Sequence, residues 1–457
     1  MHIDLLNPEV TGRHSPDPLR FAFARKRGAH AGGMSNMVPP QAIQAELIQA
    51  YNQAPAQRHG PRCLYLHIPF CRVRCTFCNF FQYASSKSLI DRYVDSLCQE
   101  IRWKASSIWA QSAPFQAVYI GGGTPTDLSA EHIRRIMADI KRHFPLTPDC
   151  EITLEGRVNR FGEDKFEAAL EAGINRFSFG VQSFNTQVRK SAKRLDDREH
   201  VLEQLDKFVH YNAAPVVIDL LFGLPHQSMA IWQQDLQDYL ASGVHGVDLY
   251  QLLEMQGIPM ATMVEQGKLP PPADTQMKAS MYAWGVEFMA RHCQRRVSVS
   301  HWARDNRERS IYNSLAKTTA EIMPLGAGGG GNLNGLQMMQ NRDLDSYIQA
   351  IEQQHYPVPM LLRTGNTHGS NACIKAAFDH GVLASRTLDL AAGSGTFAAL
   401  KPLFALWQQN GLISLSSAPA SEGGDEYLQL TLAGQFWSVT LSQILIEVLQ
   451  SNLAAAA

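Results

Sequence analysis

Short apolar runs alternate with longer amphipathic stretches from about residue 62 onward. The stretch over residues 88–105 places Ile90, Val94, Leu97 and Ile101 on one face at helical spacing. Similar helical patterns occur at residues 130–143, 164–172, 197–211 and 231–241. Strands are predicted at residues 63–68, 117–120, 151–154, 175–179, 216–221 and 247–251. Alternation of this kind is typical of parallel βαβ units, so the pattern predicts an α/β fold with six such units.

Six strand–helix units predict a partial (β/α)6 barrel of the TIM type, with its site at the C-terminal ends of the strands. The chain divides into a basic N-terminal arm (1–58), the barrel (59–300), a Gly-rich connecting region (301–359) and a C-terminal cap domain (360–457). The arm is expected to be extended before a short helix near residues 41–51. Gly326 and Gly328 to Gly331 predict a flexible segment. The run from Tyr427 to Gly434 resembles a strand entering a helix, as in a small winged-helix domain.

The overall charge is nearly balanced, with 41 Lys and Arg against 42 Asp and Glu. No whole-chain field therefore favours nucleic acid or an anionic membrane as a partner. The longest apolar runs fall short of the roughly 20 residues that a bilayer helix needs, and the N-terminus is polar. We expect a cytoplasmic protein.

One local charge imbalance lies in the arm, where only Asp17 opposes five basic residues between positions 11 and 30. These are Arg13, Arg20, Arg25, Lys26 and Arg27. Two interpretations stay open: a solvated basic face, or a clamp over an anionic ligand in a nearby cleft.

Three of the eight cysteines, Cys71, Cys75 and Cys78, fall within eight residues directly after the first strand. Disulfide frameworks are typical of small, cysteine-rich secreted chains, so we expect free thiols in a reducing compartment. Three thiolates at this spacing can bind three irons of a [4Fe–4S] cluster and leave the fourth iron open. A zinc site would need a fourth ligand such as His67, and no second cysteine pair follows. The spacing therefore favours the cluster.

A glycine turn, Gly121-Gly-Gly-Thr-Pro-Thr126, follows the second strand. Its glycines let the backbone approach a ligand closely, and it lacks the Lys-Ser/Thr ending of a phosphate-binding loop. Polar residues also stand at four later strand ends: Glu155, Gln182, Asp219, and Tyr250 with Gln251. Their positions predict one shared cleft. Glu155 suits a ligand ammonium, Asp219 suits ribose hydroxyls, and Arg194 could pair with a carboxylate.

The cysteine motif, with Phe77 before its last cysteine, resembles the radical S-adenosylmethionine (SAM) superfamily. In that superfamily the amino and carboxylate groups of SAM chelate the open iron, and one-electron reduction releases a 5′-deoxyadenosyl radical. The resemblance implies a radical SAM barrel with a [4Fe–4S] cluster held by the three cysteines. It further implies that SAM contacts Tyr65, Phe77, Gly122, Gly123, Thr124, Glu155, Gln182, Arg194 and Asp219. Leu253 would lie beside the adenosyl group, and the branch considered next can hold two SAM molecules.

Residues 62 to about 360 resemble the branch that contains oxygen-independent coproporphyrinogen III oxidases and haem chaperones. The resemblance rests on Tyr65-Leu-His-Ile-Pro-Phe-Cys71, the glycine turn, Gly180-Val-Gln-Ser-Phe184, Asp219 with Gly223-Leu-Pro225, and Tyr250-Gln-Leu252. The oxidases typically carry a fourth cysteine just beyond the motif, where this chain reads Cys78-Asn79-Phe80-Phe81. The chaperones typically carry an HNxxYW stretch, where it reads Arg309-Ser-Ile-Tyr-Asn-Ser-Leu315. Both departures weaken those two functions.

A third subgroup of the branch is more similar at several segments, namely the anaerobic haem-degrading radical SAM methyltransferases, also called anaerobilin synthases. The similar segments are residues 17–33, Cys78 to Phe81, His301-Trp-Ala-Arg304 and Leu325-Gly-Ala-Gly328. This resemblance implies that haem is the substrate, that a carbon from the SAM methyl group is added to it, and that the macrocycle opens at a meso bridge. Iron would be freed as a linear tetrapyrrole forms. A flavodoxin-type electron donor and a downstream tetrapyrrole reductase are the implied partners.

Haem as substrate suggests roles for the arm. Arg20, Arg25 and Arg27 could pair bidentately with its propionates. His14, His30 and His301 are the candidate axial ligands, although a surface or hydrogen-bonded histidine is the more common state. Two other functions remain open: a porphyrinogen decarboxylase, and a haem-binding or delivery protein that keeps the cluster.

Overall fold

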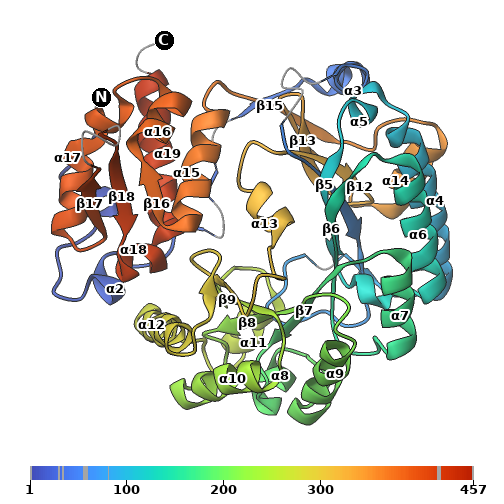
Figure 1. Cartoon of the computed structure of the whole chain (residues 1–457), viewed down its shortest axis with the longest axis horizontal. Helices are drawn as coiled ribbons and strands as arrows, with labels where there is room; N and C mark the ends of the chain where they lie inside the picture. Colours follow the sequence, from blue (N-terminus) through green and yellow to red (C-terminus); the bar gives the residue numbers. More distant parts are fainter. Residues whose placement is uncertain are drawn as a thin grey trace.

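The computed structural model describes residues 3–28, 31–32, 35–54, 60–80, 82–418 and 424–454. Figure 1 shows a large α/β part built around one sheet, and a smaller part in orange and red that holds the last five helices. The N-terminal segment lies against this smaller part. No helix in the described ranges is long and apolar enough to cross a membrane.

Seven parallel strands form the centre of the large sheet, in the order β12-β2-β5-β6-β7-β8-β9. Their bounds are β12 Glu321–Leu325, β2 Arg62–Ile68, β5 Phe115–Gly122, β6 Leu146–Gly156, β7 Arg176–Gln182, β8 Val216–Phe222 and β9 Gly246–Gln251. All six predicted strands are confirmed. In β2 six of seven residues are buried, because a parallel strand covered on both faces needs a nearly continuous apolar run.

Amphipathic helices connect these strands and cover the sheet (Figure 1). The main ones are α4 Lys87–Ala105, α6 Ala130–His143, α7 Glu163–Ala172, α9 Arg198–His210, α10 Met229–Ala241 and α12 Thr275–Arg291. The first five confirm the predicted helices. Capping side chains set several starts: Ser129, Asp197 and Ser228 each accept a hydrogen bond from a backbone amide in the first turn. In α4 the predicted face is buried, with Val94, Leu97 and Ile101 fully enclosed.

The segment after residue 300 contributes strands to the same sheet. β11 (His301–Ala303) pairs antiparallel with β9, and β12 pairs parallel with β2. β13 (Gly330–Leu333), β14 (Leu336–Met339), β15 (Met360–Thr364) and β1 (Ser35–Met37) extend the sheet beyond β12. The domain limits proposed from the sequence stay predictions. Residues 301–359 nevertheless do more than connect two domains, because they add strands to the large sheet.

The prediction of a flexible glycine segment is wrong. Gly330 and Gly331 lie within β13 and pair with Met339 and Met338 of β14. A Cβ atom at Gly326 would collide with the Tyr93 hydroxyl and the His67 carbonyl. These glycines are present because backbones approach each other closely there, and not because the chain is loose.

The cap domain holds a three-stranded antiparallel sheet, β16 (Val382–Ala384), β18 (Glu426–Leu430) and β17 (Ile413–Ser417). Its helices are α15 His368–His380, α16 Ser385–Ala392, α17 Thr396–Gln409, α18 Leu432–Phe436 and α19 Ser438–Ala454. β18 followed by α18 confirms the predicted strand and helix at residues 427–434.

The N-terminal arm is not extended, contrary to the prediction. It forms the short helices α1 (Pro8–Thr11) and α2 (Pro18–Phe21), and the predicted helix near residue 41 is α3 (Ile43–Tyr51). The Trp437 indole donates to the carbonyls of Pro18 and Leu19, and Phe23 packs edge-on against Trp437 at 5.4 Å. Apolar residues among the basic ones therefore fix the arm to the cap domain.

Candidate functional site

The three clustered cysteines lie in the loop that follows β2. Cys71 ends the short strand β3 (Phe70–Cys71), which pairs with β4 (Tyr83–Ala84) on the far side of the loop. Cys71 and Cys75 are buried, and Cys78 is half-buried. Thr76 anchors the loop, since its hydroxyl donates to the Ser191 carbonyl and its own carbonyl accepts from the Met260 amide. The parallel sheet thus presents all three thiols at its carboxyl edge.

Each of the three sulfurs accepts a hydrogen bond from a different donor. The Thr124 hydroxyl lies 3.2 Å from Cys71 Sγ, the Arg157 guanidinium 3.2 Å from Cys75 Sγ, and the Phe80 amide 3.3 Å from Cys78 Sγ. Donors aimed at sulfur stabilise the thiolate form that binds iron. Burial raises the pKa of the Cys71 thiol, while Thr124 and Arg157 lower it.

The spread of these thiols distinguishes a cluster from a single ion. In the part of the chain that the structure describes, no three His, Cys, Asp or Glu side chains lie close enough to share one metal ion. A four-iron cluster separates its thiolates, because each binds a different iron. His67, the one zinc ligand considered from the sequence, instead contacts the Tyr65 hydroxyl at 3.0 Å through Nδ1. The donor set fits a [4Fe–4S] cluster.

The glycine turn after β5 packs directly under this loop. The Gly123 amide donates to the Ile68 carbonyl at 2.7 Å, and a Cβ at Gly123 would meet the Phe70 carbonyl oxygen at 2.5 Å. Gly122 has φ +114° and faces the His67 ring, which a side chain there would strike. Glycine is required by these close approaches, which place the backbone of the turn beside the cysteine loop.

Arg194 and Gln182 lie together next to the cysteine loop. The Gln182 amide and the Arg194 guanidinium both crowd the position of a Cβ at Gly180, at 2.6 and 3.1 Å. Gln182 sits at a bulge between β7 and β8 with φ +73°, a strained conformation that redirects its side chain. The Arg194 guanidinium lies 5.9 Å from the centre of the Phe77 ring, and its buried Nε has no hydrogen-bond partner among the described residues. A buried, incompletely paired guanidinium suits an anionic ligand group.

Two half-buried carboxyl groups of the sheet carry shifted pKa values: Glu155 lies next to the last residue of β6, whereas Asp219 lies in the middle of β8 and not at its end. Burial raises the pKa of Glu155 to about 7, although bonds from Tyr119 and the Gly122 amide lower it. Burial, Asp248 and Glu155 together raise the pKa of Asp219 to about 8. Buried carboxyl groups in a cleft that stay without a matching cation are candidates for binding one. Tyr65 lies nearby, with its ring stacked 6.3 Å from Tyr119.

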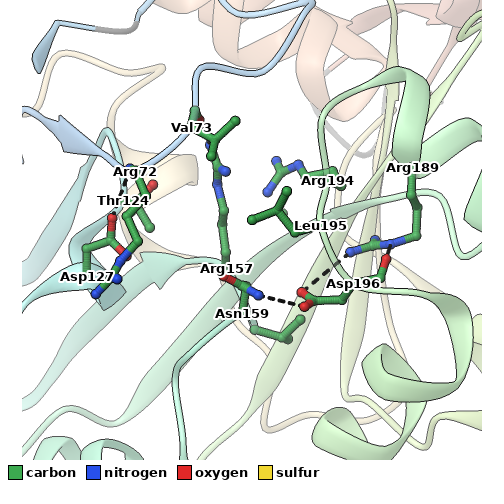
Figure 2. A pocket seen from close by; sticks show the side chains of 12 residues that line it. Arg72, Val73, Thr124, Asp127, Arg157, Asn159, Arg189, Arg194, Leu195 and Asp196 are labelled. Carbon is green, nitrogen blue, oxygen red and sulfur yellow. Dashed lines mark hydrogen bonds and ion pairs between the residues drawn. The ribbon is translucent and has the colours of Figure 1, made fainter. Parts of the chain in front are cut away.

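A small cavity of about 20 Å³ opens beside the loop (Figure 2). Figure 2 shows Arg157 extending to Val73 of the loop, with Arg194 beside it. Arg157 donates to the Val73 carbonyl as well as to Cys75. Sequence reasoning missed Arg157. Its position directly after Glu155 and Gly156, at the end of β6, was the available signal.

A much larger cavity of about 660 Å³ lies between the strand ends, the arm and the cap domain. Tyr250 of β9 and Leu253, which follows β9, form part of its wall, and Phe80 connects it to the cysteine loop. The arm contributes Lys26, and the cap domain contributes Phe378 and Phe436, among others. Its volume is within the range of ligand pockets, and its wall is mostly apolar with a few charged groups.

The comparisons with known proteins agree with this geometry. Residues 65–238 match the model of the radical SAM superfamily. The chain is 38% identical to the anaerobilin synthase of Escherichia coli O157:H7, over 89% of this chain and 88% of that protein. The chain belongs to the anaerobilin synthase family.

Two further relatives fit the wider branch. The haem chaperone HemW of Synechocystis is 29% identical over 65% of this chain and 73% of its own length. The fold matches the structure of coproporphyrinogen III oxidase (HemN) from Escherichia coli, with a TM-score of 0.76 over 95% of this chain and 99% of that one. At 19% identity that match shows the α/β radical SAM fold alone. As a radical SAM protein, this member of the family uses a [4Fe–4S] cluster and SAM.

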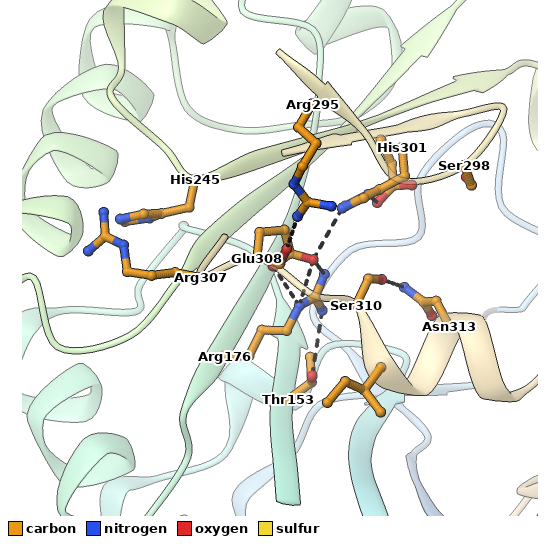
Figure 3. Close-up of polar contacts among 12 residues, drawn as sticks. Thr153, Arg176, His245, Arg295, Ser298, His301, Arg307, Glu308, Ser310 and Asn313 are labelled. Carbon is orange, nitrogen blue, oxygen red and sulfur yellow. Dashed lines mark hydrogen bonds and ion pairs between the residues drawn. The ribbon is translucent and has the colours of Figure 1, made fainter. Parts of the chain in front are cut away.

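His301, one of the predicted axial ligands, contacts protein carboxylates through both of its ring nitrogens, and its role toward haem stays a prediction. Figure 3 shows His301 beside Glu308, which also faces Arg176, in a buried network. Nδ1 lies 2.8 Å from Asp248 and Nε2 3.1 Å from Glu308, which also pairs with Arg176 at 2.9 Å. Burial alone would lower the pKa of His301, but the two carboxylates raise it to about 9. With that pKa both ring nitrogens carry protons at neutral pH, so binding of iron would require the loss of a proton and of one of these contacts.

Of the other predicted haem contacts, four lie outside the wall of the large cavity: Arg20, Arg25, Arg27 and His14. Arg20 pairs with Asp17 at 2.6 Å and donates to Ser280, while Arg27 pairs with Glu447 at 2.5 Å and donates to the Glu9 carbonyl. Arg25 and His14 are exposed, and His30 lies outside the described residues. Two of the three arginines are thus already satisfied by the protein's own groups.

Proposed function

We propose that the chain is a radical SAM enzyme that opens haem without oxygen. A carbon derived from the SAM methyl group is added to the porphyrin, the macrocycle opens, and iron and a linear tetrapyrrole are released. The observation that carries this proposal is the large cavity, which joins the cysteine loop at Phe80 in a chain of the anaerobilin synthase family. Its volume of about 660 Å³ and its aromatic wall suit a large, flat, mostly apolar molecule.

In this proposal Cys71, Cys75 and Cys78 hold the cluster, and the residues at the following strand ends hold SAM. When bound, the cluster and SAM supply the organic radical and the added carbon. The chain's own contribution is to bind, to orient and to exclude water.

Three side chains have matched tasks toward SAM. Arg194 binds the carboxylate of the methionine part, since its Nε is buried without a partner among the described residues. Glu155, with its pKa of about 7, binds the ammonium group, which would in turn keep the carboxylate ionised. Asp219 accepts from the ribose hydroxyls. Gly122, Gly123, Thr124, Gln182, Tyr65 and Phe77 complete the contacts, and Leu253 separates SAM from the large cavity.

The proposal includes the partners implied by the chemistry. Electrons come from a flavodoxin-type donor, and a tetrapyrrole reductase takes the product, in the cytoplasm. Haem opening can be tested without these partners, because a chemical reductant replaces the electron donor in vitro.

Product analysis tests the function. The cluster-reconstituted protein is incubated anaerobically with haem, SAM and a chemical reductant, and absorbance, chelatable iron and product mass are recorded. The proposal predicts loss of the Soret band, release of iron, and a product that is heavier than the iron-free tetrapyrrole by about one methyl-sized unit. Unchanged, bound haem would indicate a delivery protein instead. Turnover of coproporphyrinogen with release of carbon dioxide would indicate a decarboxylase.

A further inference from the structure

Two lysines on the wall of the large cavity have no acidic partner. Lys26 comes from the N-terminal arm, and Lys375 comes from α15 of the cap domain. Other lysines nearby are paired: Lys317 Nζ lies 2.7 Å from Asp379, and Lys278 Nζ lies 2.8 Å from Glu254. Among the residues that the structure describes, neither Lys26 nor Lys375 forms an ion pair. An ammonium that is largely removed from water without an anion is costly, so the absence of a partner needs a reason.

The surroundings of Lys26 disfavour its own charge. Its Nζ lies 4.9 Å from the centre of the Phe436 ring, a contact that favours a cation only weakly. Burial and the nearby Lys278 lower the pKa of Lys26 to about 7. Lys278 has an acidic partner of its own, since its Nζ donates to Glu254.

Lys375 is in a similar position on α15 of the cap domain. It is half-buried, burial lowers its pKa, and Asp379 one turn later on the same helix is taken by Lys317. Phe378 lies beside it on the cavity wall. Both ammonium groups therefore lie beside aromatic rings on the wall of one cavity, although the two lysines are near opposite ends of the sequence.

We infer that Lys26 and Lys375 anchor the carboxylate groups of the tetrapyrrole that occupies the large cavity. The inference rests on the proposed function for the identity of the tetrapyrrole, and it adds which residues recognise the acidic side chains. An ionised carboxylate of the ligand pairs with each ammonium group, for which the described residues provide no acidic partner. Lys26 and Lys375 thus take the role that the sequence suggested for Arg20 and Arg27. The guanidinium groups of those two arginines form ion pairs with Asp17 and Glu447.

Binding measurements without turnover test this inference. Haem and haem dimethyl ester, in which both carboxylates are esterified, are titrated into the cluster-reconstituted protein without SAM or reductant. Lys26→Gln and Lys375→Gln should each weaken haem binding about tenfold, because a charge-assisted hydrogen bond is lost. The ester should bind wild type and variants alike. Lys401→Gln is the control, since Lys401 lies on α17 of the cap domain and pairs with Glu426 away from the cavity.

The outcomes separate this inference from the proposed function. If both variants keep wild-type affinity for haem, or a full preference for haem over its ester, the inference is wrong even when haem is opened. If haem does not bind but coproporphyrinogen does, and the two lysines control that affinity, the proposed substrate is wrong and the inference stands. SAM cleavage and the unfolding temperature are measured for each variant. A variant that loses either of them is replaced by Lys26→Arg or Lys375→Arg, which should restore haem binding.

Discussion

The residues around the cysteine loop come from consecutive loops of one sheet, whereas the walls of the large cavity come from three distant parts of the chain. Around the loop, Thr124, Glu155 and Gln182 each stand at the end of a successive parallel strand. Around the cavity, Lys26, Tyr250 and Phe436 come from the arm, the sheet and the cap domain. Short motifs can specify the first arrangement because strand order brings the loops together. The second depends on how the parts dock, which no local motif encodes.

The largest effect is expected in the cysteine loop, from the loss of one cluster ligand. Cys75→Ala should abolish the brown cluster absorbance and SAM cleavage, because the two remaining thiolates leave another iron without its ligand. Cys71→Ala and Cys78→Ala should behave alike. Cys98→Ala is the control: Cys98 lies in α4, and both signals should persist. Retained SAM cleavage in Cys75→Ala would refute the cluster assignment.

The buried network behind the cavity should have the next largest effect, on stability. His301→Gln removes the imidazolium that joins Asp248 to Glu308 and should lower the free energy of unfolding by about 3–5 kcal/mol at pH 6.5. Denaturant unfolding measures this. His210→Gln, on an exposed turn of α9, should change it by less than about 0.5 kcal/mol.

The same histidine predicts a pH dependence of stability. Because the pKa of His301 is raised to about 9 in the folded protein, its stabilising effect is complete below pH 6.5 and is lost as the pH rises through 9. The wild-type free energy of unfolding should therefore fall between pH 6.5 and 9, and His301→Gln should reduce that slope. Equal slopes in both proteins would contradict the protonated assignment.

Replacement of Arg194 should weaken SAM binding without loss of the cluster. Arg194→Gln should weaken SAM affinity about 10- to 100-fold, as expected for loss of a buried charge-assisted contact. Equilibrium binding of SAM and cluster absorbance are measured together. Arg198→Gln changes an arginine that pairs with Asp238 between α9 and α10, and it should leave SAM affinity unchanged. Loss of the cluster in Arg194→Gln would assign Arg194 to loop folding instead.

The smallest effect is expected on the arm. Arg20→Ala and Arg27→Ala should change haem affinity less than about threefold, since exposed ion pairs contribute little and neither side chain lines the cavity. Haem is titrated into these two variants and into Lys26→Gln, and the three affinities are compared. A tenfold loss in Arg27→Ala, with Lys26→Gln unchanged, would restore the role that the sequence suggested and remove the one inferred for Lys26.

By itself, the sequence determined the parallel sheet and the cysteine loop. Apolar runs at residues 63–68 and 216–221, with helical patterns between strands, specify buried parallel strands, and Cys71, Cys75 and Cys78 follow the first of them. These features are local, since a strand period and a ligand spacing act over a few residues.

Tertiary structure decided how the distant parts meet. Glu308 lies seven residues after His301 in a loop, and only the sheet pairing of β11 with β9 places His301 between Glu308 and Asp248. Packing also gives neighbouring basic residues of the arm different surroundings. Arg27 forms an ion pair with Glu447, whereas Lys26 lies over the Phe436 ring at the cavity. Neighbouring basic residues look equivalent in a sequence, but the free energy of each charge depends on the partners and the water that the folded chain leaves to it.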